Sequence, residues 1–148
     1  MDVTAMNGKY NWMKVIDVMT KTPYTVMPSD TIGRAGELMS AHGVRQLPVV
    51  AGKILVGVIS DRDIRSSISD QTRFDTIGAD NRFEILVGDT MTRDPVTLSP
   101  DDALPKAVEA LIEDKFGGFP VVNGDAELVG IVTYIDLLSC FLNRLREH

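Results

Sequence analysis

Hydrophobic and polar residues follow two different periods along this chain, and each change of period marks a new element. In the first half Ile32, Ala35 and Met39 fall on one helical face, behind the expected capping residues Ser29 and Asp30. Apolar, β-branched runs then predict two strands joined by a tight turn. The predicted elements are an extended piece at 25–27, a helix from Ile32 to Gly43, strands at 46–50 and 54–60 around a turn at 52–53, and a helix at 61–68.

The second half shows the same order of periods, so each half is predicted to be β-α-β-β-α. Its predicted elements are an extended piece at 96–98, a cap at 99–102, a helix carrying Leu104 and Leu111, strands at 119–122 and 127–133 around a turn at 123–124, and a final helix. The final helix has a stripe of Ile135, Leu138, Leu142 and Leu145, which Leu137 and Phe141 widen. So broad an apolar face on a terminal helix needs a second surface to cover it.

Residue identities repeat together with the pattern. The repeated pairs are Met19-Thr20 and Met91-Thr92, Pro23 and Pro95, Leu47-Pro48-Val49-Val50 and Phe119-Pro120-Val121-Val122, and Ser60-x-x-Asp63 and Thr133-x-x-Asp136. The offset is 72 positions (48 + 72 = 120) until one extra residue near Asp125 lengthens it. An internal repeat sets the architecture. We expect an α+β module in which two similar halves pack on each other and form paired clefts.

The chain divides into four stretches. Residues 1–12 have no periodicity and form an N-terminal extension, 13–68 form the first motif, and 83–148 form the second. Residues 69–82 are polar and contain glycine, which predicts a linker. The two motifs are expected to form one module.

Composition and charge exclude several classes of protein. The net charge is −6 and no basic stripe is present, so we expect no nucleic-acid partner. No apolar run is long enough for a membrane span and no secretory signal is visible, which predicts a cytoplasmic protein without a membrane partner. With one cysteine and two histidines, neither an internal disulfide nor a thiolate or histidine metal site is expected.

The strongest candidates for chemistry are the two Ser/Thr-x-x-Asp sequences at the passage from strand to helix. A hydroxyl residue followed three positions later by an acid is a capping box, which satisfies backbone N–H groups at a helix start. The same aspartate could instead accept hydrogen bonds from two ribose hydroxyls. Both interpretations can hold together, because a cap positions the side chain as well as stabilising the helix.

Taken together, the two apolar-Pro-Val-Val strands, the Met-Thr-x-x-Pro starts and the Ser/Thr-x-x-Asp ends resemble the cystathionine-β-synthase (CBS) domain family. The resemblance covers Val15 to about Leu142. Within the family, the chain is similar to stand-alone bacterial CBS pairs of the acetoin-utilisation type. The resemblance implies two motifs packed through their sheets (a Bateman-type module) and clefts for AMP, ADP, ATP or S-adenosylmethionine. It also implies a regulatory homodimer with no catalytic residue, no cofactor and an unidentified regulated partner.

The resemblance assigns roles to particular residues. Asp63 and Asp136 would hold ribose hydroxyls, with Ser60 and Thr133 near the sugar or phosphate. Arg45 would reach the ligand phosphates, and Arg62 lies inside the first box. The residues that would flank or wall the adenine are Thr20, Thr22 and Pro23, Thr92, Asp94 and Pro95, and the apolar Val44 and Phe116.

The second copy departs from the first at its cations. Arg45 is replaced by Gly117, and Arg62 is replaced by Ile135. The second site therefore binds a less charged ligand, borrows a cation from elsewhere, or stays empty. We expect the first site to be the better phosphate binder.

Two functions remain open from the sequence. The leading hypothesis is a non-catalytic sensor of an adenosine-containing ligand, because the boxes are duplicated and no nucleophile-base pair is evident. The alternative is an enzyme that hydrolyses or transfers a nucleotide phosphate with Asp63 or Asp136 as base or metal ligand.

A homodimer is predicted from helix faces that keep apolar residues beyond those needed inside one chain. These residues are Leu137 and Phe141 on the last helix, and Leu104 and Leu111 on the helix after Asp102. The alternative is that this face packs on the segment around Trp12 and Met13 of the same chain.

Overall fold

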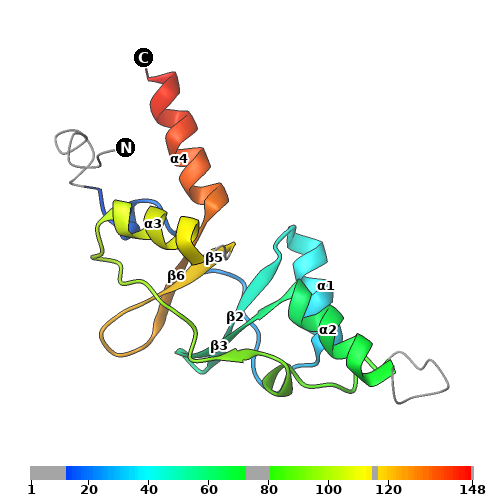
Figure 1. Cartoon of the computed structure of the whole chain (residues 1–148). Helices are drawn as coiled ribbons and strands as arrows, with labels where there is room; N and C mark the ends of the chain where they lie inside the picture. The colour runs from blue at the N-terminus through cyan, green and yellow to red at the C-terminus, as the bar shows by residue number, and fades with distance from the viewer. Residues whose placement is uncertain (1–12, 73–80, 115–116, 148) are drawn as a thin grey trace. The chain divides into compact units, whose positions relative to one another are not determined.

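The computed structural model describes residues 13–72, 81–114 and 117–147, which fall into two compact units (Figure 1). Unit 2 consists of Pro23–Pro95. Unit 1 combines the chain up to Thr22 with the chain from Val96 onward. Each unit has a three-stranded sheet of its own, and each is described by itself.

Unit 2 is a sheet in the order β2-β3-β4 with two helices. Its elements are α1 (Ile32–His42), β2 (Gln46–Ala51), β3 (Ile54–Ser60), α2 (Asp61–Thr72), the 3₁₀-helix η3 (Val87–Asp89) and β4 (Thr92–Arg93). Strands β2 and β3 form an antiparallel hairpin, and β4 adds to β3 in the antiparallel sense. One face of α1 packs on alternate residues of the hairpin, and the core includes Ile32, Ala35, Met39, Leu47, Val49, Ile59 and Ile64.

Unit 1 has the equivalent arrangement, with the sheet order β1-β6-β5. Its elements are η2 (Val15–Asp17), β1 (Thr20–Lys21), α3 (Leu104–Asp114), β5 (Gly118–Val122), β6 (Leu128–Thr133) and α4 (Tyr134–Arg146). The core consists of Val15, Leu98, Ala107, Phe119, Val121 and Val132. Phe119 is the largest of these side chains, at the position that Leu47 holds in unit 2.

Each sheet is completed by the segment that precedes the other repeat; we call residues 13–22 and 83–95 the leading segments. Strand β1 precedes the first repeat but pairs with β6, and β4 precedes the second repeat but pairs with β3. A Cβ atom on Gly57 would lie 2.7 Å from the Thr92 carbonyl oxygen, and one on Gly130 would lie 2.9 Å from that of Thr20. The leading strands approach so closely because these two positions are glycine.

Most of the predicted elements are present, with two corrections at helix ends. The helix end predicted at Gly43 and the turn predicted at Gly52 are confirmed, with left-handed φ values of 63° and 64°. The cap of α1 is Thr31, whose hydroxyl accepts a hydrogen bond from Arg34 N at 3.1 Å, and neither Ser29 nor Asp30 caps it. Helix α2 continues to Thr72 rather than ending at 68, so the start of the predicted linker is helical.

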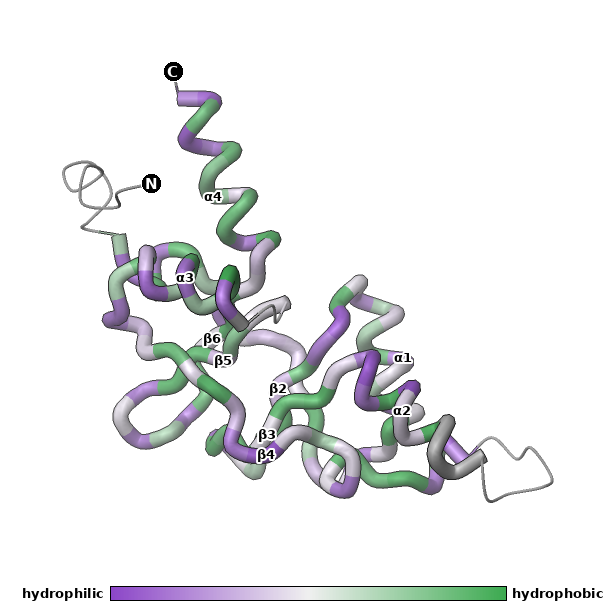
Figure 2. Tube along the Cα trace, in the orientation of Figure 1, coloured by the Kyte–Doolittle hydropathy of each residue, from purple (hydrophilic) through white to green (hydrophobic). Residues whose placement is uncertain are grey.

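The predicted apolar dimer face needs a larger correction. Leu104, Leu111 and Leu137 are half-buried against the core of unit 1, so less of each side chain is exposed than predicted. Phe141 is 61% exposed, as predicted. No residue of α4 is buried, although apolar residues occur along its whole length (Figure 2). The exposed apolar face of α4, which we call the α4 face, consists of Ile135, Leu138, Phe141, Leu142 and Leu145.

Candidate functional site

In unit 2 the box Ser60-x-x-Asp63 closes the passage from β3 into α2. Ser60 N donates to Asp63 Oδ2 at 2.9 Å, and Asp63 N donates to Ser60 Oγ at 3.1 Å. These reciprocal bonds form a capping box. The capping interpretation is therefore confirmed for this copy, and it holds the half-buried Asp63 carboxylate at the start of the helix.

In unit 1 the box Thr133-x-x-Asp136 caps α4 in the same way. Thr133 N and Thr133 Oγ1 donate to Asp136 Oδ2 at 2.8 and 3.0 Å. The other carboxylate oxygen, Oδ1, accepts a hydrogen bond from Thr20 Oγ1 at 2.9 Å. Thr20 belongs to β1, so the leading segment reaches the box of the opposite repeat.

The predicted adenine-flanking segments lie beside these boxes. Thr92 pairs with Val58 of β3, and Thr20 pairs with Ile131 of β6, so each leading strand runs next to the strand that ends in the box. The residues before the two prolines are left-handed, with φ of 48° at Thr22 and 49° at Asp94. Such a conformation costs energy for a residue other than glycine, and it is concentrated at functional sites. Its occurrence at both equivalent positions, directly before Pro23 and Pro95, supports a role in ligand binding.

Positive charge gathers near the box of unit 2. Asp61 N donates to the Arg45 carbonyl oxygen at 2.9 Å, so the backbone of Arg45 lies against the start of α2, where Arg62 is also found. Both arginine side chains are exposed. Arg93 of β4 donates from its guanidinium to the Gly88 carbonyl oxygen at 3.2 Å. Unit 2 therefore carries arginines on three segments that adjoin the box: the turn before β2, the start of α2 and the strand β4, which pairs with β3.

The equivalent positions of unit 1 are mostly uncharged. Tyr134 N donates to the Gly117 carbonyl oxygen at 3.2 Å, which repeats the contact made by Arg45 but without a side chain. Ile135, in place of Arg62, is 55% exposed. Lys21, in place of Arg93, is the cation that remains among these three positions. Phe116 lies outside the described residues.

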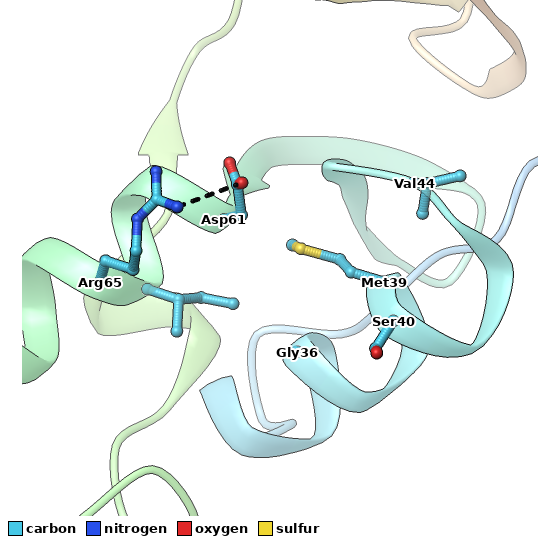
Figure 3. A pocket seen from close by; sticks show the side chains of 7 residues that line it. Gly36, Met39, Ser40, Val44, Asp61 and Arg65 are labelled. Carbon is cyan, nitrogen blue, oxygen red and sulfur yellow. Dashed lines mark ion pairs between the residues drawn. The ribbon is translucent and has the colours of Figure 1, made fainter.

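A pocket of about 300 Å³ opens between α1 and α2 of unit 2 (Figure 3). Its lining residues are Gly36, Met39, Ser40, Val44, Asp61, Ile64 and Arg65. Val44 is the member that was predicted from sequence, whereas Arg45, Ser60 and Asp63 do not line it. Arg65 Nη1 lies 3.7 Å from Asp61 Oδ2 at the rim. The sequence offered no signal for this pocket, because its residues serve mainly as the packing surface between two helices.

A second feature was also missed from the sequence. The rings of Tyr24 and His42 stack with centroids 3.6 Å apart and an interplanar angle of 12°. Tyr24 follows Pro23, and His42 ends α1 just before Val44, so the stack joins two of the predicted ligand segments within unit 2. Val96 stands in the place of Tyr24 in unit 1, so the repeat pattern itself could not point to the pair.

One carboxyl group among the residues that the structure describes has a shifted pKa. Burial opposes ionisation of Asp102, but the hydrogen bond from Ser99 N and the ammonium of Lys106 outweigh it and hold the pKa below the ordinary 3.8. Asp102 belongs to the turn before α3 and is not part of either box.

The described residues contain no cluster of three or more histidine, cysteine, aspartate or glutamate side chains able to hold a metal ion. None of their helices combines the length and the apolar character that crossing a bilayer requires.

Comparison with solved structures gives neighbours that are CBS pairs. CBSX2 of Arabidopsis thaliana in complex with AMP is 32% identical, with a TM-score of 0.73 over 88% of this chain and 96% of that chain. An acetoin utilization protein (AcuB) of Vibrio cholerae is 31% identical, with a TM-score of 0.77 over 90% and 93%. The CBS pair of MJ0100, in complex with 5'-methylthioadenosine and S-adenosyl-L-methionine, is 25% identical with a TM-score of 0.73 over 87% and 99%.

Curated relatives include much longer proteins. The chain spans 21% and 23% of two inosine-5'-monophosphate dehydrogenases, from Korarchaeum cryptofilum and Methanocaldococcus jannaschii, to which it is 35% and 32% identical over 76% and 85% of its own length. The family model of the CBS domain matches twice, at residues 15–70 and 87–143. The chain therefore belongs to the CBS domain family and carries a tandem pair of its motifs.

Proposed function

We propose that this protein is a non-catalytic regulatory module that binds an adenosine-containing ligand at its Ser/Thr-x-x-Asp boxes. The observation that carries the proposal is the duplicated junction, in which a carboxylate at a helix start lies beside a leading strand. A carboxylate held by a cap can accept two hydrogen bonds from a ribose diol, and such charge-assisted bonds are strong. CBSX2 with AMP and MJ0100 with S-adenosyl-L-methionine support this ligand class.

The ligand would act by shifting populations. A ligand that contacts both a box and its neighbouring leading strand favours the conformation in which the strand is docked on the sheet. A partner protein that binds that conformation better than others would then respond to ligand concentration.

Isothermal titration with AMP, ADP, ATP and S-adenosylmethionine tests the proposal. We expect saturable heat with at least one of the four, together with a rise in melting temperature, because a ligand that binds the folded state stabilises it. If all four give neither heat nor a thermal shift, the ligand proposal fails. Incubation with ATP and Mg²⁺, followed by chromatography, tests the non-catalytic assignment; sustained product that disappears in Asp63→Ala would make the protein an enzyme.

The α4 face supports a homodimer as part of the same proposal. Its five apolar side chains are 46–61% exposed, so covering the exposed part of each would contribute about half of the roughly 1.5–3 kcal/mol that full burial of an exposed side chain provides, and together they still favour a two-fold interface. Light scattering at micromolar concentration should give twice the chain mass of 16.2 kDa. A mass near 16.2 kDa would exclude the dimer.

A matched pair of variants locates the interface. Phe141→Glu places a charge on the α4 face and should give a monomer, whereas Asn143→Glu places the same charge on the same helix, outside that face, and should stay dimeric. Dimers in both variants would place the interface elsewhere.

A further inference from the structure

The carboxylates of Asp63 and Asp136 hold equivalent positions but are bonded differently. In unit 1 both oxygens of Asp136 accept hydrogen bonds, Oδ2 from Thr133 and Oδ1 from Thr20 Oγ1 at 2.9 Å. In unit 2 Asp63 Oδ2 accepts from Ser60 N, and Oδ1 accepts no hydrogen bond from any described residue. The box of unit 2 therefore offers a carboxylate oxygen that the box of unit 1 has already engaged.

The difference does not come from the register of the leading strands. Thr20 lies opposite Ile131, and Thr92, its equivalent, lies opposite Val58, the equivalent of Ile131. Both hydroxyls therefore start from the same place along the sheet, but Thr92 makes no hydrogen bond to Asp63 within the described part of unit 2.

What differs is the side-chain contact that joins the leading segment to the helix after the box. In unit 2 the hydroxyls of Thr90 and Ser67 lie 3.4 Å apart, one helical turn beyond Asp63. The equivalent residues of unit 1 are Val18 and Cys140, and valine has no polar group to form such a contact. In unit 1 the leading segment is joined to the box itself, by the hydrogen bond from Thr20 to Asp136.

We propose that Thr20 is an internal competitor for the ligand at Asp136, so that the two boxes fill in order, Asp63 first and Asp136 second. This inference rests on the proposed function. A ribose hydroxyl that approaches Asp136 Oδ1 must displace the hydroxyl of Thr20, whereas a hydroxyl that approaches Asp63 Oδ1 displaces no described group. Because a net hydrogen bond of this kind changes an equilibrium by roughly two- to tenfold, Thr20 weakens the second site by about that factor.

Displacement also has a structural consequence. The bond from Thr20 to Asp136 ties β1, a strand of only two residues, to the start of α4. A ligand that occupies Asp136 replaces this bond, so residues 13–22 stay docked at the second box only if the ligand itself contacts the leading strand.

The test uses adenosine, which carries no phosphate, so its affinity does not depend on the arginines beside the box of unit 2. Adenosine is titrated into Asp63→Ala, so that the measured binding comes from the Asp136 box alone. Adding Thr20→Val, which keeps the shape of the side chain and removes the hydroxyl, should tighten adenosine binding roughly two- to tenfold. Thr20→Ser, which restores a hydroxyl, should return the weaker affinity. In the matched experiment at the other box, Thr92→Val in Asp136→Ala should not tighten binding.

The outcomes separate this inference from the proposed function. If the unaltered protein binds neither adenosine nor AMP, the proposed function fails and the competition fails with it. If the unaltered protein binds but Thr20→Val gives equal or weaker affinity at Asp136, the competition alone is overturned, and a weaker affinity would show that Thr20 contacts the ligand. Far-ultraviolet circular dichroism checks folding of each variant, and Thr20→Ala replaces Thr20→Val if the latter does not fold.

Discussion

Helices α2 and α4 follow equivalent boxes, but they differ in how they are buried. Ile64 of α2 is buried in the core of unit 2, and Ile68 packs against that core. The equivalent positions of α4 are Leu137, which packs on the core of unit 1, and Phe141, which is exposed. In Figure 1, α2 lies along α1, whereas α4 extends beyond α3. The same capping sequence thus starts both helices, but the neighbouring helix decides how much of each is covered.

A repeat can therefore preserve local structure while its two copies take on different tasks. Unit 2 packs one face of its second helix, through Ile64 and Ile68, on its core and has arginines beside its box. Unit 1 leaves an apolar helix exposed and engages its box with Thr20. We therefore expect unit 2 to be the stronger nucleotide site and unit 1 to supply the contact between subunits. Four predictions test this division.

The largest effect is expected from the core of unit 1. Phe119→Ala should lower the free energy of unfolding by about 3–5 kcal/mol, because Phe119 is 2% exposed and its removal leaves a cavity. Chemical denaturation measures the loss. Phe141→Ala is the matched control, since the same substitution on the exposed α4 face should cost far less within one chain. Similar losses at a protein concentration where both variants are monomeric would contradict the difference in burial.

Next is the contrast between the two carboxylates. Asp63→Ala should weaken adenine-nucleotide binding by about 2–4 kcal/mol, from lost charge-assisted hydrogen bonds, and lower stability by about 1 kcal/mol, from the lost cap. Asp136→Ala should cost less affinity and more stability, because Asp136 also accepts the bond from Thr20. Calorimetric titration and thermal melting measure the two quantities. An unchanged dissociation constant with a lowered melting temperature in Asp63→Ala would make Asp63 a cap alone.

A smaller effect is expected from the cations. Arg45→Ala should reduce AMP or ATP affinity by about 1 kcal/mol, the value of an exposed ion pair, and leave adenosine nearly unchanged. Gly117→Arg, which restores the cation at the equivalent position of unit 1, should raise nucleotide affinity there. Equal losses of AMP and adenosine binding in Arg45→Ala would place Arg45 away from the phosphates.

The smallest effect concerns pH and the turn before α3. The pKa of Asp102 is lowered in the folded protein, so its ionised form contributes stability above pH 3.8, and that contribution is lost as the pH falls through the folded pKa. Lys106 lies 3.1 Å from this carboxylate. Lys106→Met should therefore cost about 0.2–0.5 kcal/mol near neutral pH and less in acid. Arg34→Met, at the equivalent position of unit 2, is the control; a pH-independent cost in Lys106→Met would contradict the ion pair.

Local pattern predicted most of the fold. Periodicity located both hairpins, and the glycines at 43 and 52 located a helix end and a turn, because positive φ is nearly free for glycine alone. The cap of α1 was misplaced because Asp30 and Thr31 are both good caps. The Asp30 carboxylate instead accepts a hydrogen bond from Met27 N at 2.7 Å, and Thr31 caps the helix. Local propensity cannot distinguish two adjacent capping residues when the outcome depends on the path by which the backbone enters the helix.

The candidate site was predicted only in part. The sequence placed Asp63 and Asp136 at helix starts, since the spacing of a capping box is local. It did not assign the leading strands to the boxes, because the partner of a two-residue strand is decided by long-range pairing. The left-handed Thr22 and Asp94, and the stack of Tyr24 on His42, depend on the same tertiary contacts.

The repeat, the capped helices, the hairpins and the two carboxylates could be predicted from the sequence, because each follows from residues a few positions apart. Long-range contacts select which leading strand completes which sheet, which apolar residues of α4 stay exposed, and which carboxylate oxygen is already engaged. The pairing of the leading strands depends on the close approach at Gly57 and Gly130, and the engaged oxygen depends on the bond from Thr20 to Asp136, between residues far apart in the chain. The spacing of residues along a sequence carries no information about contacts between distant residues, because only the fold brings those residues together.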